Sequence, residues 1–494
     1  MRVWHTIRMY RDNLPQYMIN GSVMLYFVVM LALLVMSPSY FMKWYWWFIG
    51  GACIAMFFYG SKRLMNNWRF LHPKRFEKRL FRTALTLRMV LTLLSYGFFY
   101  MMTGGFFDFE PADVEWYDEV AADIADRFYD GHFNIIESFN YTTGGKTGLD
   151  DAGYPVYLGV VYILVNKSKL LARLIQCVWS AYICLFVYRI GQRHFEEPTA
   201  RLAAIFTLFM PNLVLYCGLH LKEVVMTFLT VWFVERADAL LVNRNFSFRT
   251  VAATMLIGLS LFSFRTVLAA TLFLAFAMTL VFGSSQMLRG GRRTLLIFIS
   301  IGFFLVAGMG RLQEEVMQIV NMDIRGQQRI SMQYRYGSQK AGGLGNKLVD
   351  KAGAAVFAPL IFTLPFPTMV ETEGQEQKRY LNGGNYVKNV MSGFVIWSMF
   401  MMLFGGNLRS LDAEWRKHVL PLAVLLGYLL VLTFSQFAHS ERFHQPILPL
   451  HMLFAAYGVA HFKPKQRWMW SAWVFVIFAI CMGWAYLKIR GRSG

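Results

Sequence analysis

Apolar runs long enough to cross a bilayer recur along most of this 494-residue chain. A helix needs about 20 predominantly apolar residues to span the hydrocarbon core. Hydrophobic residues make up 56% of the chain and charged residues only 16%, which excludes an ordinary soluble enzyme of this length. The runs lie near residues 21–38, 41–60, 83–103, 170–190, 202–219, 224–242, 250–283, 294–310, 386–405, 419–437, 447–462 and 468–487. The sequence therefore predicts an all-α membrane protein, a polytopic helical bundle.

Arg265 interrupts the longest of these runs, at residues 250–283. Because this run is too long for one crossing, we interpret it as two short spans, which brings the expected total to roughly thirteen transmembrane helices. The first run follows a basic amino terminus and a second run follows it at once. We therefore expect the first hairpin, and not a cleaved signal peptide, to direct the chain to the membrane.

The distribution of charge predicts which loops lie on each side of the membrane. Residues 61–82 carry eight Lys or Arg and one acid, which is typical of a cytoplasmic segment. The next span then runs outward and places residues 105–152, with twelve Asp or Glu and two basic residues, on the outer face. We attribute the net charge of +20 to cytoplasmic loops that face anionic membrane lipids, and we expect no nucleic-acid partner.

On this topology the chain divides into four parts. Residues 1–82 form an N-terminal transmembrane hairpin with a basic cytoplasmic loop, and residues 386–494 form the C-terminal transmembrane helices. Between them, residues 83–310 form a transmembrane core that includes the first outer loop, 105–152. Residues 311–385 form a long outer loop, in which an apolar segment too short to span predicts a re-entrant or interfacial helix.

A short amphipathic helix is expected in the first outer loop, and one carboxylate lies on its apolar face. At 100° per residue, one side of this helix carries Asp113, Trp116, Tyr117, Val120, Ala121, Ile124 and Phe128. The opposite side carries Glu115, Asp118, Glu119 and Asp126, which we expect to face water. One interpretation is that Asp113, which follows Pro111 and Ala112, merely caps the N-terminus of this helix. A carboxylate held against apolar surface is instead a stronger base, so we favour a catalytic Asp113.

From this helix onward the chain resembles the C-type (GT-C) membrane glycosyltransferases, especially the branch that contains protein O-mannosyltransferases and lipid A aminoarabinose transferases. In that family an Asp of the first outer loop is followed by Tyr four residues on and by Ala eight residues on, as are Asp113, Tyr117 and Ala121 here. The helices that follow are similar in the same order over residues 106–241. Near the C-terminus, "ERFHQPILPLHMLFAAYG" is similar to the start of a late family helix.

The resemblance implies a GT-C-like fold and the transfer of a sugar from a polyprenyl-phosphate donor to a lipid, glycan or protein acceptor. A lipid phosphate leaves as a stable anion, so one base and several cations suffice for a single displacement that inverts the anomeric carbon. The outward-facing loops would carry this chemistry, on the periplasmic side if the protein lies in a bacterial inner membrane. We expect no specific cofactor, although the chemistry leaves room for a divalent cation.

Further outward-facing residues are candidates for binding the donor phosphate or for assisting the base. Glu223 begins a returning helix, where it either favours the helix dipole or acts with Asp113. Arg265 either extends toward the membrane surface or binds phosphate, and Arg442 either anchors an interfacial helix or binds phosphate through its planar fork. The proposed phosphate-binding and substrate-binding set is Lys222, Arg265, Arg442, His439 and Tyr117.

Two other functions remain open. A polymerase or ligase that joins lipid-diphosphate-linked oligosaccharides would keep the fold, with the loop after Arg311 as its polysaccharide platform. A transporter or flippase usually shows internal repeats or acids at mid-depth in its spans, and here Arg88, Glu235, Arg236 and Asp238 are expected near span ends. The pattern favours the transferase.

Overall fold

The computed structural model describes residues 14–107, 112–132, 134–142, 151–243, 247–282, 302, 369–370, 379–404, 414–434 and 440–493. These residues are predominantly helical, and the β-structure among them is one isolated bridge between Phe41 and Val370. The α-helices are α2 (Gln16–Met36), α3 (Trp44–Trp68), α4 (Pro73–Thr103), α5 (Ala112–Tyr129), α6 (Ile135–Thr142), α7 (Gly153–Val165), α8 (Lys169–His194), α9 (Glu197–Phe209), α10 (Pro211–Leu215), α11 (Glu223–Asn243), α12 (Phe248–Ser260), α13 (Thr266–Phe282), α18 (Asn382–Phe404), α19 (Val419–Phe434), α20 (Glu441–His444), α21 (Leu448–Ala460) and α22 (Arg467–Ser493). The 3₁₀ turns are η1 (Pro38–Tyr40), η2 (Tyr216–Gly218), η3 (Leu261–Ser263), η5 (Arg379–Leu381), η6 (Glu414–His418), η7 (Gln445–Ile447) and η8 (Pro464–Gln466).

Six helices in the described part of the chain are long and apolar enough to cross a membrane, or seven if the bent pair α9 and α10 counts as one span. Each apolar run that falls in this part coincides with a helix, which confirms a helical membrane protein. The expected total of about thirteen spans is not confirmed. Helices α7, α12 and α13 are apolar but have only 13, 13 and 17 residues, and the run at 294–310 lies outside the described residues.

Two local expectations have different outcomes. The chain breaks beside Arg265 as expected, because η3 separates α12 from α13 there. The basic segment at 61–82, expected to be cytoplasmic, is mostly helical, since α3 continues to Trp68 and α4 already begins at Pro73. Proline suits the first turn of a helix, where its missing N–H has no partner to lose.

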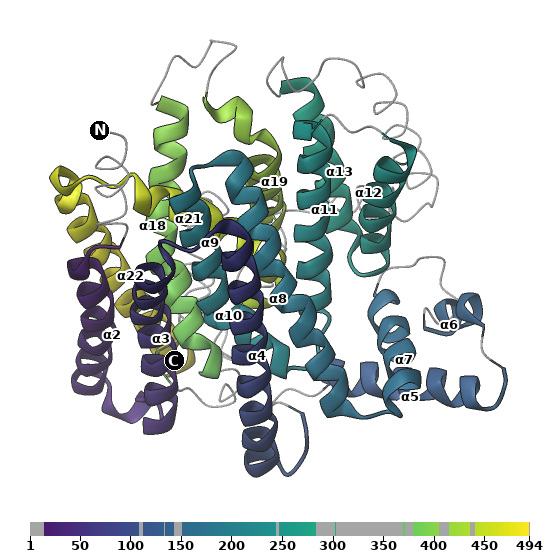
Figure 1. Cartoon of the computed structure of the whole chain (residues 1–494). Coiled ribbons are helices and arrows are strands. Elements are labelled where there is room, and N and C mark those ends of the chain that lie inside the picture. Colours follow the sequence, from purple (N-terminus) through teal and green to yellow (C-terminus); the bar gives the residue numbers. More distant parts are fainter. Residues whose placement is uncertain are drawn as a thin grey trace.

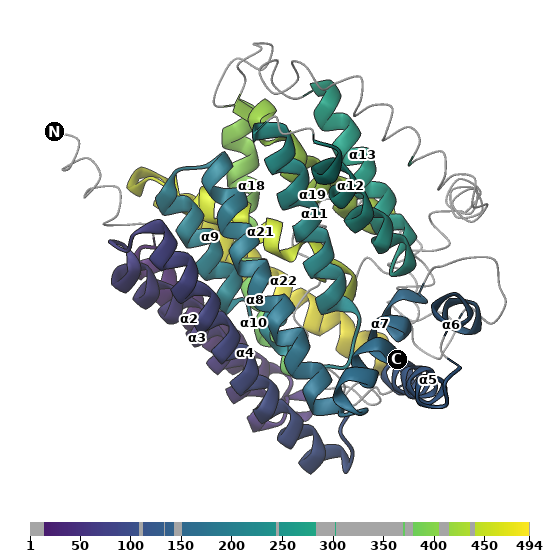
Figure 2. The same cartoon turned by 45° about the vertical axis from the view of Figure 1, so that its right-hand side comes forward.

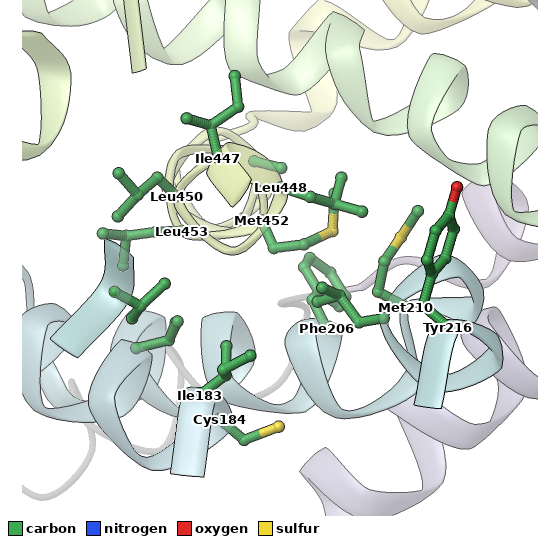
Figure 3. Close-up of a cluster of buried hydrophobic side chains, with 14 of the residues drawn as sticks. Ile183, Cys184, Phe206, Met210, Tyr216, Ile447, Leu448, Leu450, Met452 and Leu453 are labelled. Atoms are coloured by element: carbon green, nitrogen blue, oxygen red, sulfur yellow. The ribbon is translucent and has the colours of Figure 1, made fainter. Parts of the chain in front are cut away.

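The helices surround α21, whose packing fixes the chain just before it. Helices α2, α3 and α4 lie along one flank of the bundle (Figures 1 and 2). Figure 3 shows α21 nearly end-on, with apolar side chains of α8 and α9 and the residues Met210 and Tyr216, on either side of α10, nearby. The labelled residues of this cluster are Ile183, Cys184, Phe206, Met210, Tyr216, Ile447, Leu448, Leu450, Met452 and Leu453. In a bilayer such close packing holds helices together by van der Waals contact.

A buried arginine stabilises the bend between α9 and α10. The two helices meet at 54°, where Pro211 has no N–H to donate to the carbonyl of Thr207, four residues earlier. Arg88 lies fully buried beside this bend and donates from Nη2 to Thr207 O at 3.3 Å and from Nη1 to Leu208 O at 3.4 Å. The guanidinium therefore replaces the missing donor, and the bend carries the chain toward residues 219–223.

We predict that Gly458→Ala destabilises the contact between α21 and α18. A Cβ at Gly458 would lie 2.1 Å from the carbonyl oxygen of Phe394, so a backbone has to move. Overpacking of this kind costs about 1–3 kcal/mol and should lower the melting temperature of the purified protein in detergent. Gly97→Ala is the matched control, because its Cβ meets nothing within 4 Å. Equal melting temperatures for the two variants would contradict the prediction.

Candidate functional site

Arg442 joins the two predicted catalytic carboxylates. Its Nη1 lies 2.5 Å from Oδ2 of Asp113, and its Nε lies 2.7 Å from Oε1 of Glu223. The Glu223 side chain is completely buried, Arg442 is 16% exposed and Asp113 is 57% exposed. The Arg442 guanidinium thus binds two carboxylates that are 329 and 219 positions away from it in the sequence.

Three elements bring these residues together at one end of the bundle. Asp113 lies in the first turn of α5, which runs across the lower end of the molecule in Figure 1. Glu223 begins α11, directly after the chain that follows the α9–α10 bend. Arg442 lies in α20, whose position is fixed because η7 and the buried helix α21 follow immediately.

Lys222 and Arg265 complete a ring of contacts with Arg442. Lys222 Nζ lies 3.3 Å from the carbonyl oxygen of Phe264, the neighbour of Arg265. The Arg265 guanidinium lies 3.9 Å from the centre of the Phe443 ring, next to Arg442. Arg442 in turn pairs with Glu223, the neighbour of Lys222. The three contacts therefore close a ring that contains Lys222, Arg265 and Arg442.

Two buried polar atoms in this ring have no hydrogen-bond partner among the described residues. They are Nη1 of Arg265, a donor, and Oε2 of Glu223, an acceptor. Buried polar groups are rarely left unmatched, and those that are need a reason such as a bound molecule. The ring therefore offers one unused donor that suits an anion and one unused acceptor that suits a hydroxyl group.

Electrostatics keep the buried members of the site charged. Burial by itself raises the pKa of Glu223, but Arg442 and Lys222 outweigh it, so the pKa lies below its usual value. Burial lowers the pKa of the Arg442 guanidinium, and Glu223 more than offsets this, so that pKa is raised. Glu223 is consequently an anion and Arg442 a cation at neutral pH.

Tyr117 lies beside this cluster and anchors α5. Its side chain is 4% exposed, and its ring meets that of Tyr154 on α7 edge-on, with centroids 5.0 Å apart. Burial and then the Glu223 charge raise the pKa of Tyr117, so the phenol stays protonated. The charges of Glu223 and Asp113 both act on the Tyr117 hydroxyl, so Tyr117 lies near the two carboxylates.

The expected orientation of α5 is partly wrong. Asp113 was expected to be held against apolar surface, but more than half of its side chain is exposed and Arg442 pairs with it. Trp116 and Phe128 are 40% and 43% exposed, although the wheel placed them on the apolar face. The buried side of the helix is instead formed by Val114, Tyr117, Val120, Ala121, Ile124 and Ala125.

Asp118 was expected to face water, and this is also wrong. Its side chain is only 14% exposed, because it accepts a hydrogen bond from the Tyr162 hydroxyl and pairs with Lys169 at 2.8 Å. The Tyr162 hydroxyl also lies 3.1 Å from Nε2 of His220, whose burial lowers its pKa well below the usual value. This network attaches α5 to the segment before Glu223. The wheel could not reveal it, because the partners come from α7, α8 and the chain after η2.

Asp151 is a second residue that the sequence analysis missed. It forms an ion pair with Lys222 and adopts a positive φ of 63°. Its place two residues before α7, within the acidic outer loop, is the only sequence feature that could have indicated it.

Two other expectations stay untested. His439 lies outside the described residues, as does the apolar segment expected to form an interfacial helix within 311–385. For a divalent cation, no group of three or more His, Cys, Asp or Glu among the described residues could serve as ligands. Arg442 occupies the position between the two carboxylates that a bridging cation would need.

Comparison with known families agrees with a membrane transferase. The model of the Alg9-like mannosyltransferase family matches residues 385–493, which include Arg442, most of α18 and the helices α19 to α22. This family is of the GT-C class, so the match supports a GT-C glycosyltransferase but not the O-mannosyltransferase or aminoarabinose branch in particular. No curated protein matches the chain. Together, the apolar helices and this match support a glycosyltransferase embedded in a membrane.

We predict that Arg442→Met destabilises the protein mainly by leaving Glu223 buried without its ion-pair partner. Removing one partner of a buried pair typically costs roughly 3–5 kcal/mol, whereas replacing both can be nearly neutral. Arg442→Met should therefore melt at a lower temperature, and adding Glu223→Gln should restore most of the loss without restoring activity. A double variant as unstable as the single one would show that the ion pair does not account for the loss.

Proposed function

We propose that the protein transfers a sugar from a polyprenyl-phosphate donor to the hydroxyl group of a lipid, glycan or protein acceptor at the outer, periplasmic face of a bacterial inner membrane. The observation that supports this most is the ring around Arg442, in which two carboxylates lie beside a buried, unmatched guanidinium donor of Arg265. The match to a mannosyltransferase family makes a mannosyl phospholipid the first donor to test.

In the proposed reaction Asp113 is the base. Its exposed carboxylate can reach an acceptor, whereas Glu223 is completely buried and held by Arg442. As the acceptor oxygen forms its bond to the anomeric carbon, its proton passes to Asp113. The bond from that carbon to the phosphate oxygen breaks on the opposite side, and the phosphate leaves with the electron pair. The anomeric configuration is thereby inverted.

The cations of the ring would stabilise the departing phosphate. Arg265 offers the buried Nη1 donor, and Lys222, only 4% exposed, adds a second positive charge close by. Charge-assisted hydrogen bonds to phosphate oxygens are among the strongest in proteins. Arg442 would contribute a further positive charge while it holds the Asp113 and Glu223 carboxylates in position. Tyr117 would form one wall of the site.

The rival polymerase or ligase reaction would require the loop after Arg311 as a platform, and residues 311–368 and 371–378 of that loop lie outside the described part of the structure. The residues of the described site would suffice for one sugar transfer, so the simple transferase is the function that we propose.

We predict that Asp113→Asn lowers turnover by about 10²- to 10⁴-fold, the usual contribution of a general base. The measurement is transfer of radiolabelled mannose from a polyprenyl phosphate, with the extracted lipid and glycan fractions of the membrane as acceptors. Glu115→Gln is the matched control, because Glu115 is an exposed acid on the same helix, and it should retain nearly full activity. Turnover of Asp113→Asn within tenfold of the native protein, with an unchanged melting temperature, would eliminate Asp113 as the base.

A labelling experiment tests the side of the membrane on which the site lies. Glu119 on α5 and Lys74 at the start of α4 are both exposed, and the charge distribution places them on opposite sides. A single cysteine at Glu119 should react with an impermeant maleimide in intact cells, after outer-membrane permeabilisation if the cells have an outer membrane. A cysteine at Lys74 should react only after lysis. Protection of the cysteine at position 119 in intact cells would place the site on the cytoplasmic side.

A further inference from the structure

An aromatic groove opens on the surface between α18 and α22, at the end of the bundle away from the candidate site. It encloses about 260 Å³. Its aromatic lining comprises Phe394, Trp397, Phe400, Phe462, Trp470 and Trp473, and the other lining residues are Gly, Ile and Met. The groove is accessible from the surface, because Ile396 and Phe400 are 39% and 51% exposed.

The rings are arranged as a rigid wall. Phe394 stacks on Trp470 with centroids 5.3 Å apart, and Trp397 stacks on Phe400 at 5.8 Å. Phe462 meets both Phe394 and Trp397 edge-on, at 5.8 and 6.3 Å. Trp473 is fixed by a hydrogen bond from its Nε1 to the carbonyl oxygen of Val390 at 3.1 Å. A preformed apolar groove of this kind suits a hydrocarbon chain.

A basic turn connects two residues that line the groove, Phe462 and Met469. Phe462 belongs to the groove, and the residues that follow it, "KPKQR" from Lys463 to Arg467, hold three cations and no acid. Lys463, Lys465 and Arg467 are all exposed, and Trp468 beside them is 70% exposed. Exposed tryptophan next to Lys and Arg is typical of the depth at which lipid headgroups lie.

One of the residues that line the groove has an unmatched polar atom. Nε1 of Trp397 is buried and has no hydrogen-bond partner among the described residues. Trp397 is within ring contact of Phe462, the residue adjacent to the basic turn. An ester carbonyl below a phosphate headgroup would supply an acceptor at this depth.

We propose that this groove binds an anionic phospholipid of the inner leaflet, with one acyl chain against the aromatic wall, an ester carbonyl at Trp397 Nε1 and the phosphate on Lys463, Lys465 and Arg467. The occupant is not the sugar donor. The donor phosphate belongs near Arg442, and the 13 residues of α21 separate the two ends by roughly 20 Å. The exclusion of the donor rests on the proposed function, whereas binding of the phospholipid itself requires no transferase activity.

Native mass spectrometry of the purified full-length protein tests the proposal, with dioleoylphosphatidylglycerol and dioleoylphosphatidylcholine as matched probes. The native protein should retain the anionic lipid preferentially. Lys463→Gln/Lys465→Gln should reduce this retention about 30-fold, because each lysine near an anionic headgroup contributes roughly a fivefold preference. Lys74→Gln/Lys78→Gln, which removes two exposed cations from α4 outside the groove, should leave it unchanged.

Further measurements distinguish binding in the groove from binding at the basic turn, and the phospholipid from the donor lipid. Ile396→Trp should fill the groove and reduce retention of both lipids, and Trp397→Phe should weaken the anionic lipid severalfold while keeping the ring. Undecaprenyl phosphate should not displace phosphatidylglycerol at equal concentration. Equal retention of the two phospholipids, equal losses in the two lysine pairs, or displacement by undecaprenyl phosphate would each overturn the assignment.

Discussion

The candidate site depends on one guanidinium that satisfies two carboxylates from distant parts of the chain. Asp113 and Glu223 are 329 and 219 positions from Arg442, so the ion pairs close long loops that local structure alone would not bring together. Glu223 cannot remain charged and fully buried without this partner, since the penalty for an isolated buried charge is several kcal/mol. The same contact therefore positions α5 against the bundle, keeps Glu223 ionised and defines the place where chemistry can occur.

Much of the fold could be predicted from the sequence because the bilayer imposes a simple requirement. A chain that must satisfy its backbone in hydrocarbon forms helices, and the apolar runs show where they lie. The break at Arg265 was predicted for the same reason, since that run is too long for one crossing and too charged at its centre. The number of spans was harder to predict, because α7, α12 and α13 are predominantly apolar yet shorter than a full crossing. A short helix that is buried in protein is as apolar as one that crosses the membrane, so hydropathy alone does not distinguish the two.

The site shows the limits of reasoning from single helices. Asp113, Glu223, Lys222, Arg265, Arg442 and Tyr117 were all identified as candidates, and the structure brings them together. The argument used for Asp113 was nevertheless incorrect, because it assumed that the face of α5 with most apolar residues is buried. Asp118 shows why this fails. A carboxylate on the polar side of a wheel is still enclosed when a neighbouring helix presents Tyr162 and another presents Lys169. Such partners depend on tertiary contacts that no periodicity records.

The bend at Pro211 has a consequence for how this sequence can vary. The carbonyl of Thr207 lacks its usual helical donor because of Pro211, and Arg88 supplies that donor from another helix. A change of Arg88 alone leaves the carbonyl unsatisfied in an apolar medium. A change of Pro211 alone restores a competing N–H, straightens the helix and deprives a buried positive charge of an acceptor. We therefore expect substitutions at these two positions to be tolerated only together, so a redesign of this region has to exchange both.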